Sequence, residues 1–437
     1  MLGADAGARG SPLRVTDQAP SPAPTRTSAA PPSARIVRGV RILIVAMYFP
    51  PAGGGGVQRP LRFAQHLVDL GFDVHALAPD DPKWVHRDPT LGFPAGVTVH
   101  RARNLGPASR RRGEREFRPR LLLRRALVPD ASVLWQLTAA FAAARIARRE
   151  RIDVVLTTSP PGSVHLAGAT AKRLAGVRWV ADLRDSLAAH PHRRYDVRGE
   201  RGLARLVGRY TDRVVCASRA IAEEMGALVP TARLEVIGNG CDFDDFAGLA
   251  YTPGERLRIT HTGNFIGRRD PKPFLAALAR APEEVVARFV GDFRPADRAY
   301  AEALGLGARV ELLPHLPHRE ALALQRDSEA LLLLIPEAAG RGRGVLSAKV
   351  FEYLAAERPI LAAVPPDGEA AALLRETDAG LVVAPDDVDG LAAALAELHG
   401  RWQAGRLNGT LLTAEMRGRL SRRARAEELA EVLRSLG

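Results

Sequence analysis

The sequence predicts an α/β protein with two doubly wound parallel sheets that face each other across a cleft. Short apolar strands alternate with amphipathic helices from residue 41 onwards, which is the pattern of a parallel sheet covered by helices on both faces. The alternation is interrupted once, by a polar segment around residues 240–256, and then restarts. A chain of 437 residues is long enough for two such domains. Both halves are therefore expected to be Rossmann-like.

Domain boundaries follow from the same pattern. Residues 1–38 are rich in Pro, Ala and Ser and contain few large apolar side chains, so we expect a disordered tail. The first domain is expected over residues 39–245 and the second over 246–415. A C-terminal helix is expected over 416–437, where "AEELAEVLRSL" has helical spacing.

The first half is predicted to begin with a buried strand and a helix that carries apolar residues at helical spacing. This helix includes Val57, Leu61, Ala64 and Val68. The strands expected here cover residues 41–47, 72–79, 153–159, 178–183, 213–218 and 233–239. The later helices are expected at residues 163–175, 203–210 and 220–228. Because parallel strands need crossover helices, this order predicts βαβ units.

The second half repeats the same alternation. Its strands are expected at residues 257–263, 286–292, 309–315, 330–336, 359–364 and 379–384. Helices are expected at residues 271–281, 297–305, 318–327, 388–400 and in the run that begins at 344. Ligands of such sheets bind beyond the carboxyl ends of the strands, so the loops that follow strands are the candidate sites.

Two candidate loops lie in the first half. Four consecutive glycines, Gly53, Gly54, Gly55 and Gly56, follow the first strand and lead into a helix, where free amides and the helix dipole favour an anionic or hydroxylated ligand. The run lacks the lysine of a P-loop and does not fit the dinucleotide fingerprint. In "WVADLRDS", Asp182, Arg184 and Asp185 cluster at a strand end, where we expect them to reach the cleft. A plain flexible turn and a loop-tying ion pair are the respective structural alternatives.

The loop after the first strand of the second half, "HTGNFIGRRDPKPFL", supplies polar and basic groups suited to a diphosphate. These are Asn264, Arg268, Arg269 and Lys272. Adjacent arginines are also common surface residues in this chain, so the grouping rather than any single residue supports a site.

The helix that begins near residue 346, in "GVLSAKVFEYLAAERPILA", is the fourth candidate. Ser347 is expected to cap it, with the amides of Leu346 to Lys349 directed into the cleft. Lys349, one of only four lysines among 62 basic residues, would add a charge beside a bound phosphate, and Glu352 would accept hydrogen bonds from ribose hydroxyls. A surface Lys–Glu pair on a helix is the structural alternative.

The net charge and the distribution of basic residues indicate which classes of partner the protein could bind. The net charge of +13 favours an anionic partner, and much of the excess lies in residues 101–151 beside apolar side chains, a mixture typical of an anionic membrane surface or of a solvated basic loop. The basic residues are dispersed and lack interleaved aromatics, which argues against nucleic acid. No apolar run approaches the roughly 20 residues that span a bilayer.

The cysteine content indicates the compartment. Cys216 and Cys241 are expected to be buried thiols in a reducing compartment, which we take to be the cytoplasm. Within it we expect the protein to be peripheral on the inner face of the plasma membrane.

Five ordered motifs between Arg41 and His399 resemble those of the family 4, or group 1, retaining glycosyltransferases of the GT-B fold. They are "YFPPAGGGGVQRP", "TTSPPGSVHLAG", "WVADLRDS", "HTGNF" and "KVFEYLAAERPILA". The resemblance implies that the second domain binds a nucleotide sugar, that the first binds the acceptor and that the C-terminal helix packs back on the first domain. The segment of Asp182 and Asp185 corresponds to a region near the acceptor and the reacting carbon.

Two positions depart from this family pattern. The family commonly has two glutamates eight positions apart, and here Glu352 matches the later one while Gly344 stands in place of the earlier. Asn264 stands where many members have an arginine, which assigns the diphosphate contacts to Arg268, Arg269, Lys272 and Lys349. The first departure leaves the identity of the donor sugar open.

The expected function is transfer of a sugar from a nucleoside diphosphate sugar to a hydroxyl of a lipid-linked or polysaccharide acceptor, with retention at the anomeric carbon. Helix amides, Lys349 and an arginine would stabilise the leaving diphosphate without a metal ion or other cofactor. Asp182 or Asp185 would orient or deprotonate the acceptor hydroxyl. Asp242 and Asp244 are interpreted as turn caps and not as a metal motif. The alternatives are a nucleotide-sugar 2-epimerase and a catalytically silent scaffold subunit of a polysaccharide assembly complex.

Overall fold

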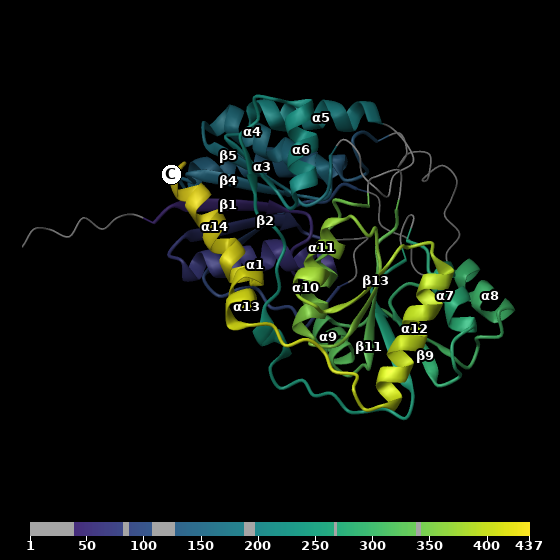
Figure 1. The fold of residues 1–437 in the computed structure, drawn as a ribbon. Helices are drawn as coiled ribbons and strands as arrows, with labels where there is room; N and C mark the ends of the chain where they lie inside the picture. Colours follow the sequence, from purple (N-terminus) through teal and green to yellow (C-terminus); the bar gives the residue numbers. More distant parts are fainter. Residues whose placement is uncertain (1–38, 82–86, 107–126, 188–196, 266–268, 338–341) are drawn as a thin grey trace, which may run out of the picture. The chain divides into compact units, whose positions relative to one another are not determined.

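The computed structural model describes residues 39–81, 87–106, 127–187, 197–265, 269–337 and 342–437. The predicted tail over residues 1–38 lies outside the described residues. Gly39–Gly437 forms one unit that contains two parallel sheets, and this confirms the predicted fold class (Figure 1).

The first sheet has seven strands. They are β1 (Arg41–Ala46), β2 (Asp73–Pro79), β3 (Val97–Ala102), β4 (Val154–Ser159), β5 (Arg178–Leu183), β6 (Arg213–Cys216) and β7 (Leu234–Val236). Their order is β3-β2-β1-β4-β5-β6-β7, with all neighbours parallel. The direction of winding reverses between β1 and β4, so the loops after these two strands border the point where such sheets bind ligands.

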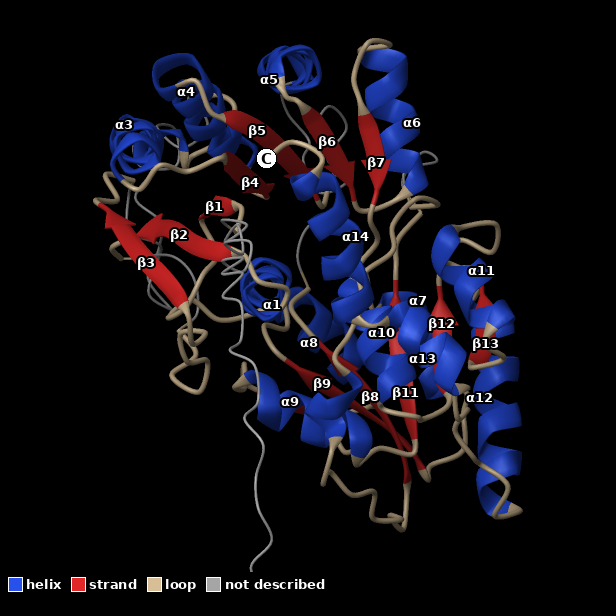
Figure 2. Ribbon diagram, turned by 90° about the vertical axis from the view of Figure 1, so that its left-hand side faces the viewer, coloured by secondary structure: helices blue, strands red, loops and turns tan. Residues whose placement is uncertain are grey.

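Two layers of helices cover this sheet. The helices are α1 (Gly55–Asp69), α3 (Val133–Arg149), α4 (His165–Ala175), α5 (Val197–Tyr210) and α6 (Arg219–Leu228), with a 3-10 turn η1 (Gly162–Val164) before α4. In Figure 2, α3, α4, α5 and α6 lie on one side of the sheet and α1 lies on the other. The apolar side chains alternate accordingly, because Leu43 of β1 packs with Trp135 of α3 whereas Ile44 packs with Phe63 of α1.

The second sheet has six parallel strands. They are β8 (Leu257–Thr262), β9 (Val285–Val290), β10 (Val310–Leu313), β11 (Ala330–Leu334), β12 (Ile360–Ala363) and β13 (Gly380–Val383). The order β10-β9-β8-β11-β12-β13 repeats the winding of the first sheet, with the reversal between β8 and β11. The loops after β8 and β11 are therefore the counterparts of the loops after β1 and β4.

The helices of the second half also form two layers. They are α7 (Lys272–Ala279), α8 (Pro295–Ala303), α9 (His318–Arg326), α10 (Ala348–Ala355), α11 (Glu369–Glu376) and α12 (Val388–Gln403), and the 3-10 turn η2 (Phe243–Phe246) lies in the segment between the sheets. One apolar core joins the sheet to α7, α8 and α12, and the other joins it to α9, α10 and α11.

The chain ends with α13 (Ala414–Leu420) and α14 (Arg422–Arg434). Ala426, Leu429 and Leu433 of α14 belong to the core that also holds Ile42 and Phe63, so α14 packs beside α1 on the first sheet (Figure 1). An added Cβ at Gly240 would lie 2.7 Å from the Leu420 carbonyl oxygen, so this glycine permits the close passage of the returning chain.

Sequence reasoning missed several elements. β3 is an edge strand whose sequence, VTVHRA, mixes polar and apolar residues and is only partly buried. The buried face of α3 consists mainly of alanines, so its 17 residues gave a weak apolar pattern and resembled a basic surface segment. The short helix α11 was not predicted, and the single C-terminal helix expected over 416–437 is two helices, α13 and α14, with a break at Ser421.

Candidate active site

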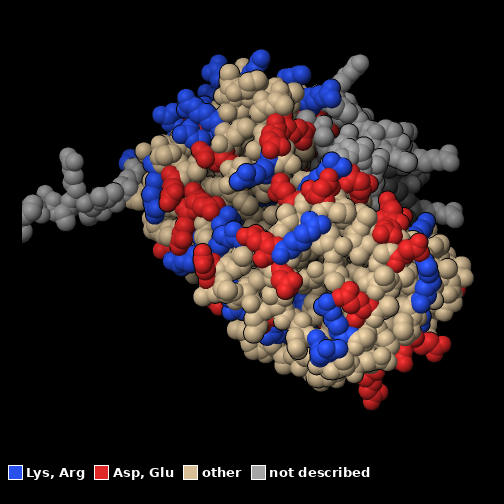
Figure 3. All heavy atoms as spheres, in the orientation of Figure 1, with Lys and Arg blue, Asp and Glu red and all other residues tan. Residues whose placement is uncertain are grey.

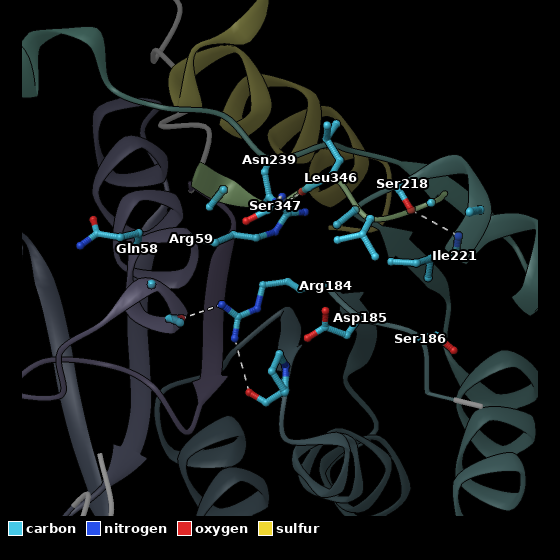
Figure 4. Close-up of a pocket in the computed structure, with 18 of the residues that line it drawn as sticks. Gln58, Arg59, Arg184, Asp185, Ser186, Ser218, Ile221, Asn239, Leu346 and Ser347 are labelled. Carbon is cyan, nitrogen blue, oxygen red and sulfur yellow. Dashed lines mark hydrogen bonds between the residues drawn. The ribbon is translucent and has the colours of Figure 1, made fainter. Parts of the chain in front are cut away.

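A cavity of about 550 Å³ lies beyond the carboxyl ends of the strands (Figure 4). The first half contributes the start of α1 and the loops after β4, β5 and β6, and the second half contributes Arg269 and residues 344–348 before and at the start of α10. Asn239, Gly240 and Arg422 complete the wall. Loops at the switch points of both sheets therefore contribute to one cavity.

Two of the four predicted loop glycines reach this cavity. Gly55 and Gly56 line it and form the beginning of α1, whereas Gly53 and Gly54 do not line it. Gly54 has a φ of 87°, in the left-handed region that glycine occupies without strain, and it sets the direction in which the helix starts. The first turn of α1 carries no acidic side chain, so the positive end of the helix dipole is directed at the cavity without a neutralising group on that turn.

Arg59 of α1 is a wall residue that sequence reasoning missed. It is only 6% exposed, and its Nη2 atom lies 2.8 Å from Asp182 Oδ1. Its Nη1 donates to the Gly238 carbonyl at 2.6 Å and its Nη2 to the Ile237 carbonyl at 2.8 Å. Within an arginine-rich chain nothing local distinguishes this arginine, because its partners are more than 100 positions away.

Asp182 does not reach the cleft, so that part of the prediction is wrong. Its side chain is fully buried and is absent from the cavity wall. On β5 it points to the same face as Val180, towards α1, where it meets Arg59 and accepts a hydrogen bond from Thr158 Oγ1 at 2.7 Å. The carboxylate thus holds Arg59 in place from behind the cavity wall.

Arg184 and Asp185 do line the cavity, next to Ser186 (Figure 4). Arg184 donates from Nε to the Ser159 carbonyl and from Nη1 to the Gly56 carbonyl, both at 2.7 Å. Burial lowers the pKa of Arg184, while Asp182 and Asp185 act in the opposite direction. Arg184 therefore joins the loops after β1, β4 and β5. Of the two predicted catalytic carboxylates, Asp182 and Asp185, it is Asp185 that borders the cavity.

The predicted cap of α10 is present. Ser347 Oγ accepts a hydrogen bond from the Lys349 amide at 3.3 Å, and α10 begins at Ala348. Leu346, Ser347 and Ala348 line the cavity, so the start of this helix is directed at it. The Leu346 carbonyl accepts from Asn239 Nδ2 at 3.2 Å, which ties this turn to the segment between the sheets.

Gly344, the position that departs from the family pattern, has a steric reason to be glycine. An added Cβ would lie 2.2 Å from the Cβ of Ala220 at the start of α6. Ala220 and Gly344 both line the cavity, one from each half of the chain. A glutamate at position 344 would therefore require the two loops to separate.

Lys349 and Arg269 form a pair of cations at the switch point of the second sheet. An added Cβ at Gly263, after β8, would lie 2.7 Å from Lys349 Nζ, so the lysine occupies the space that this glycine leaves open. Arg269 lines the cavity and donates to the carbonyls of Asn264 at 2.8 Å and Leu334 at 3.3 Å. Lys349 itself is not among the residues that line the cavity.

The electrostatics of this pair favour an anion. Burial first and the charge of Arg269 second lower the pKa of Lys349 to about 7, while Glu352 acts in the opposite direction. Burial also lowers the pKa of Arg269. The adjacent His261 ring has its pKa lowered by burial and by both cations, so it does not add a third charge. An incoming anion would relieve the repulsion between the two cations.

Glu352 is held by protein groups in this structure. His318 Nε2 lies 3.3 Å from Glu352 Oε1, Gln325 Nε2 lies 3.5 Å from Oε2, and Arg422 Nη2 lies 3.7 Å from Oε1. Burial would raise the pKa of Glu352, but the His318 hydrogen bond and the charges of His318 and Arg422 lower it to about 2. The carboxylate is therefore ionised and oriented, although it is not part of the cavity wall.

The remaining predicted donor residues do not line the cavity. Asn264 Oδ1 accepts a hydrogen bond from the Asp292 amide at 2.8 Å, so it shapes the loop after β8. Lys272 begins α7 and its Nζ lies 5.7 Å from the centre of the Tyr300 ring. Arg268 lies outside the described residues.

Asp242 has a different role from the predicted turn cap. It precedes η2, but its side chain makes no capping hydrogen bond. Instead it pairs with Arg62 at 3.0 Å, His66 at 3.2 Å and Arg422 at 3.1 Å. Burial would raise the pKa of Asp242, yet these partners lower it to about 2. The group links α1, the segment between the sheets and α14.

Among the described residues, no group of three or more His, Cys, Asp or Glu side chains is arranged to hold a metal ion. Cys216 and Cys241 are both buried and unbridged, as predicted. No helix in the described part of the chain combines the length and the apolarity needed to cross a bilayer.

Comparison with known proteins identifies the two halves separately. Residues 54–240 match the family model of the glycosyl transferase 4-like domain, and residues 256–401 match that of the glycosyl transferases group 1. No curated protein sequence matches the chain significantly.

Solved structures resemble the fold at low sequence identity. Sucrose-phosphate synthase from Thermosynechococcus elongatus superposes with a TM-score of 0.64 at 18% identity, covering 91% of this chain and 99% of that one. HepE from Anabaena, in complex with UDP and glucose, gives a TM-score of 0.64 at 17% identity over 91% of this chain and 100% of that one. The lipopolysaccharide outer core galactosyltransferase WaaB gives 0.53 at 14% identity over 90% and 96%. The two family matches, in the expected order on two Rossmann-like sheets, show that the chain belongs to the group 1 glycosyltransferases with the GT-B fold.

Proposed function

We propose that the protein transfers a sugar from a nucleoside diphosphate sugar to a hydroxyl of a lipid-linked or polysaccharide acceptor, with retention of the anomeric configuration. Membership of the group 1 glycosyltransferases supports the class of reaction. HepE, a structural neighbour, has been solved in complex with UDP and with UDP-glucose, which supports a nucleotide sugar as donor.

The observation that carries the proposal is the cation pair beside the start of α10. Lys349 and Arg269 lie together at the switch point of the second sheet, where burial first and the charge of Arg269 second lower the pKa of Lys349. The turn formed by Leu346, Ser347 and Ala348 adds helix amides to the same wall of the cavity. A diphosphate is the anion whose charge and size match two cations and a helix start.

In the proposed mechanism this cluster stabilises the leaving group. Negative charge accumulates on the diphosphate as the bond to the sugar breaks, and fixed cations and amides in a partly buried site stabilise it without reorganisation. Glu352 is ionised and held by His318 and Arg422. It would accept a hydrogen bond from a ribose hydroxyl once the donor is bound.

The first half is proposed to receive the acceptor. Asp185 is the candidate to orient or deprotonate the acceptor hydroxyl, because it is the carboxylate of the predicted pair that borders the cavity. Arg184 would keep this loop against the glycine loop through its hydrogen bonds to the Ser159 and Gly56 carbonyls. Asp182 would act indirectly, by fixing Arg59.

The test combines binding and product analysis. Calorimetric titration with UDP, GDP and ADP should identify one nucleotide that binds, and the matching sugar donor should be consumed when acceptor is added. The anomeric proton coupling of the product, measured by NMR, decides between retention and inversion. Absence of binding and of donor hydrolysis with every nucleotide sugar would instead favour the silent scaffold subunit.

A further inference from the structure

The helices α3, α4 and α5 present an unusual surface. They lie side by side on one face of the first sheet (Figure 2). Their sequences contain a single acidic residue, Glu200, and that side chain is buried. We call the solvent-exposed side chains of these three helices the α3–α5 face. The helices on the other face of the first sheet contain more acidic residues, because α14 alone contains three glutamates.

Large apolar side chains are exposed on this face. Leu137 and Phe141 of α3 are 60% and 65% exposed, Leu174 of α4 is 42% exposed, and Tyr210 of α5 is 63% exposed. Leu137 and Phe141 are four positions apart and therefore neighbours on one side of α3. A shallow groove of about 500 Å³ between α3 and α4 is lined by Phe141 and Leu174 together with arginines.

Arginines surround these apolar groups. The groove is completed by Arg145, Arg148 and Arg149 of α3. On α5, Arg201, Arg205 and Arg209 are all exposed and recur every four residues, so they form a straight row along the helix. Figure 3 shows basic side chains along the edge of the molecule over α4 and α5.

Few of these charges are neutralised within the described residues. Arg149 pairs with Glu150, and Arg148 donates to the Leu174 carbonyl. Within the part of the chain that the structure describes, Arg201, Arg205 and Arg209 are not paired with a carboxylate. An exposed surface that combines unpaired arginines with protruding leucine, phenylalanine and tyrosine side chains is typical of an interaction site.

We propose that the α3–α5 face binds an anionic lipid bilayer. The arginines would contact lipid phosphates, and the apolar side chains would insert into the boundary between headgroups and acyl chains. Nucleic acid would match the charge but would not bury Leu137, Phe141 and Leu174. The inference goes beyond the proposed function, because it depends on neither the donor nor the acceptor.

The direction of the helices places the cavity close to a bilayer bound on the α3–α5 face. In a parallel sheet the crossover helices run antiparallel to the strands, so α4 begins at the carboxyl edge of the sheet, just after Pro160 of the cavity wall. A bilayer on the α3–α5 face would lie along the flank of the first half, with the cavity open beside it. A membrane-embedded acceptor could then reach the cavity by lateral diffusion.

The test is flotation of the full-length protein with vesicles of phosphatidylcholine alone or mixed with phosphatidylglycerol. The variant Arg201→Glu/Arg205→Glu/Arg209→Glu removes the row on α5. A basic side chain near an anionic surface contributes about 1 kcal/mol, so the triple variant should bind phosphatidylglycerol vesicles at least about 100-fold more weakly. Raising the salt concentration should weaken binding of the parent protein.

A matched control changes the net charge equally on the second half of the chain. Arg298, Arg375 and Arg406 are exposed there, and the variant Arg298→Glu/Arg375→Glu/Arg406→Glu should keep most of the binding. Leu137→Ser/Phe141→Ser should weaken binding even at high salt, because it removes insertion and leaves every charge. Melting temperatures establish that each variant is folded.

Three results would overturn the inference. Equal binding of the parent to neutral and anionic vesicles would exclude recognition of lipid charge. Equal losses in the α5 variant and its control would show that only net charge matters. Binding to RNA but not to vesicles would assign the face to nucleic acid. Because none of these assays contains a nucleotide sugar, failure here leaves the proposed glycosyl transfer untouched.

Discussion

Lys349 should couple donor binding to protonation. Burial and Arg269 lower its pKa to about 7, so near neutral pH a large fraction of the free protein carries an uncharged lysine. A bound diphosphate favours the charged form and must raise this pKa. Binding should therefore take up a proton above about pH 7, and donor affinity should fall as the pH rises through that range.

The magnitude follows from the contact that the lysine would make. A hydrogen bond to a charged group contributes about 1.5 to 3 kcal/mol, and one pKa unit corresponds to about 1.4 kcal/mol, so binding should raise the pKa of Lys349 by about one to two units. Donor affinity should accordingly weaken about 5- to 25-fold between about pH 7 and pH 9, and about 10- to 100-fold over the whole titration. Lys349→Ala should reduce catalytic efficiency by a similar factor, and Lys349→Arg should restore only part of it, because a planar guanidinium cannot occupy a compact ammonium site in the same geometry.

The assay is calorimetric titration at several pH values with the intact nucleotide sugar, whose diphosphate is a diester and does not itself titrate in this range. Repeating each titration in two buffers with different ionisation enthalpies measures the proton uptake directly. Lys349→Ala is the control, since its affinity should be lower but independent of pH over the same interval. If the alanine variant shows the same pH dependence as the parent protein, the titrating group is not Lys349 and the placement of the diphosphate is wrong.

The remaining predictions concern the fold around the cavity. Asp182→Asn should lower the free energy of unfolding, measured by urea denaturation, by about 3 to 5 kcal/mol, because it leaves the Arg59 guanidinium buried without its partner. Asp185→Asn should mainly lower the rate of sugar transfer. Equal stabilities of the two variants would contradict the structural role of Asp182. Gly344→Ala should lower both activity and melting temperature through its collision with Ala220, and adding Ala220→Gly should restore them, a rescue that fails if the loss has another cause. Glu352→Gln should chiefly weaken nucleotide binding, so an unchanged dissociation constant would remove this residue from the donor site. Deleting residues 1–38 should leave melting temperature and activity unchanged, because a polar, proline-rich segment adds no core, and a large drop in melting temperature would refute this.

The alternation of strands and helices was sufficient to predict both sheets, because buried parallel strands are short apolar runs that a single sequence displays locally. The same information failed for β3 and α3. An edge strand keeps polar residues on a half-exposed surface, and a helix that packs through alanine shows little contrast between its faces. Local patterning thus predicted the elements with strongly apolar faces and missed those without.

For the site, sequence position predicted which loops meet but not which side chains turn towards the cavity. Gly55, Gly56, Asp185 and Ser347 are in the wall as expected. Asp182 lies one position from the end of β5, and the strand's alternation turns it towards α1 and away from the cleft. Whether the Asp182 side chain points to α1 or to the cavity depends on where β5 ends and the exposed loop begins, and the sequence does not define this to one residue.

Arg59 and Arg422 could not be found from the sequence. Both line the cavity and are held by ion pairs with residues distant in the sequence. Arg59 pairs with Asp182, and Arg422 pairs with Asp242 and Glu352. In a chain with 62 basic residues, composition offers no means to distinguish them. Such contacts follow from the return of α14 to the first sheet, which only the folded structure shows.

We propose that Lys349 and Arg269, beside the cavity, bind the diphosphate of a sugar donor. Release of free nucleoside diphosphate from a panel of nucleotide sugars, measured without acceptor for the parent protein and for Lys349→Ala, tests it most directly. We expect the parent protein to hydrolyse one donor slowly and the variant to hydrolyse it about 10- to 100-fold more slowly. Hydrolysis at the same rate by the variant would show that Lys349 does not bind the diphosphate.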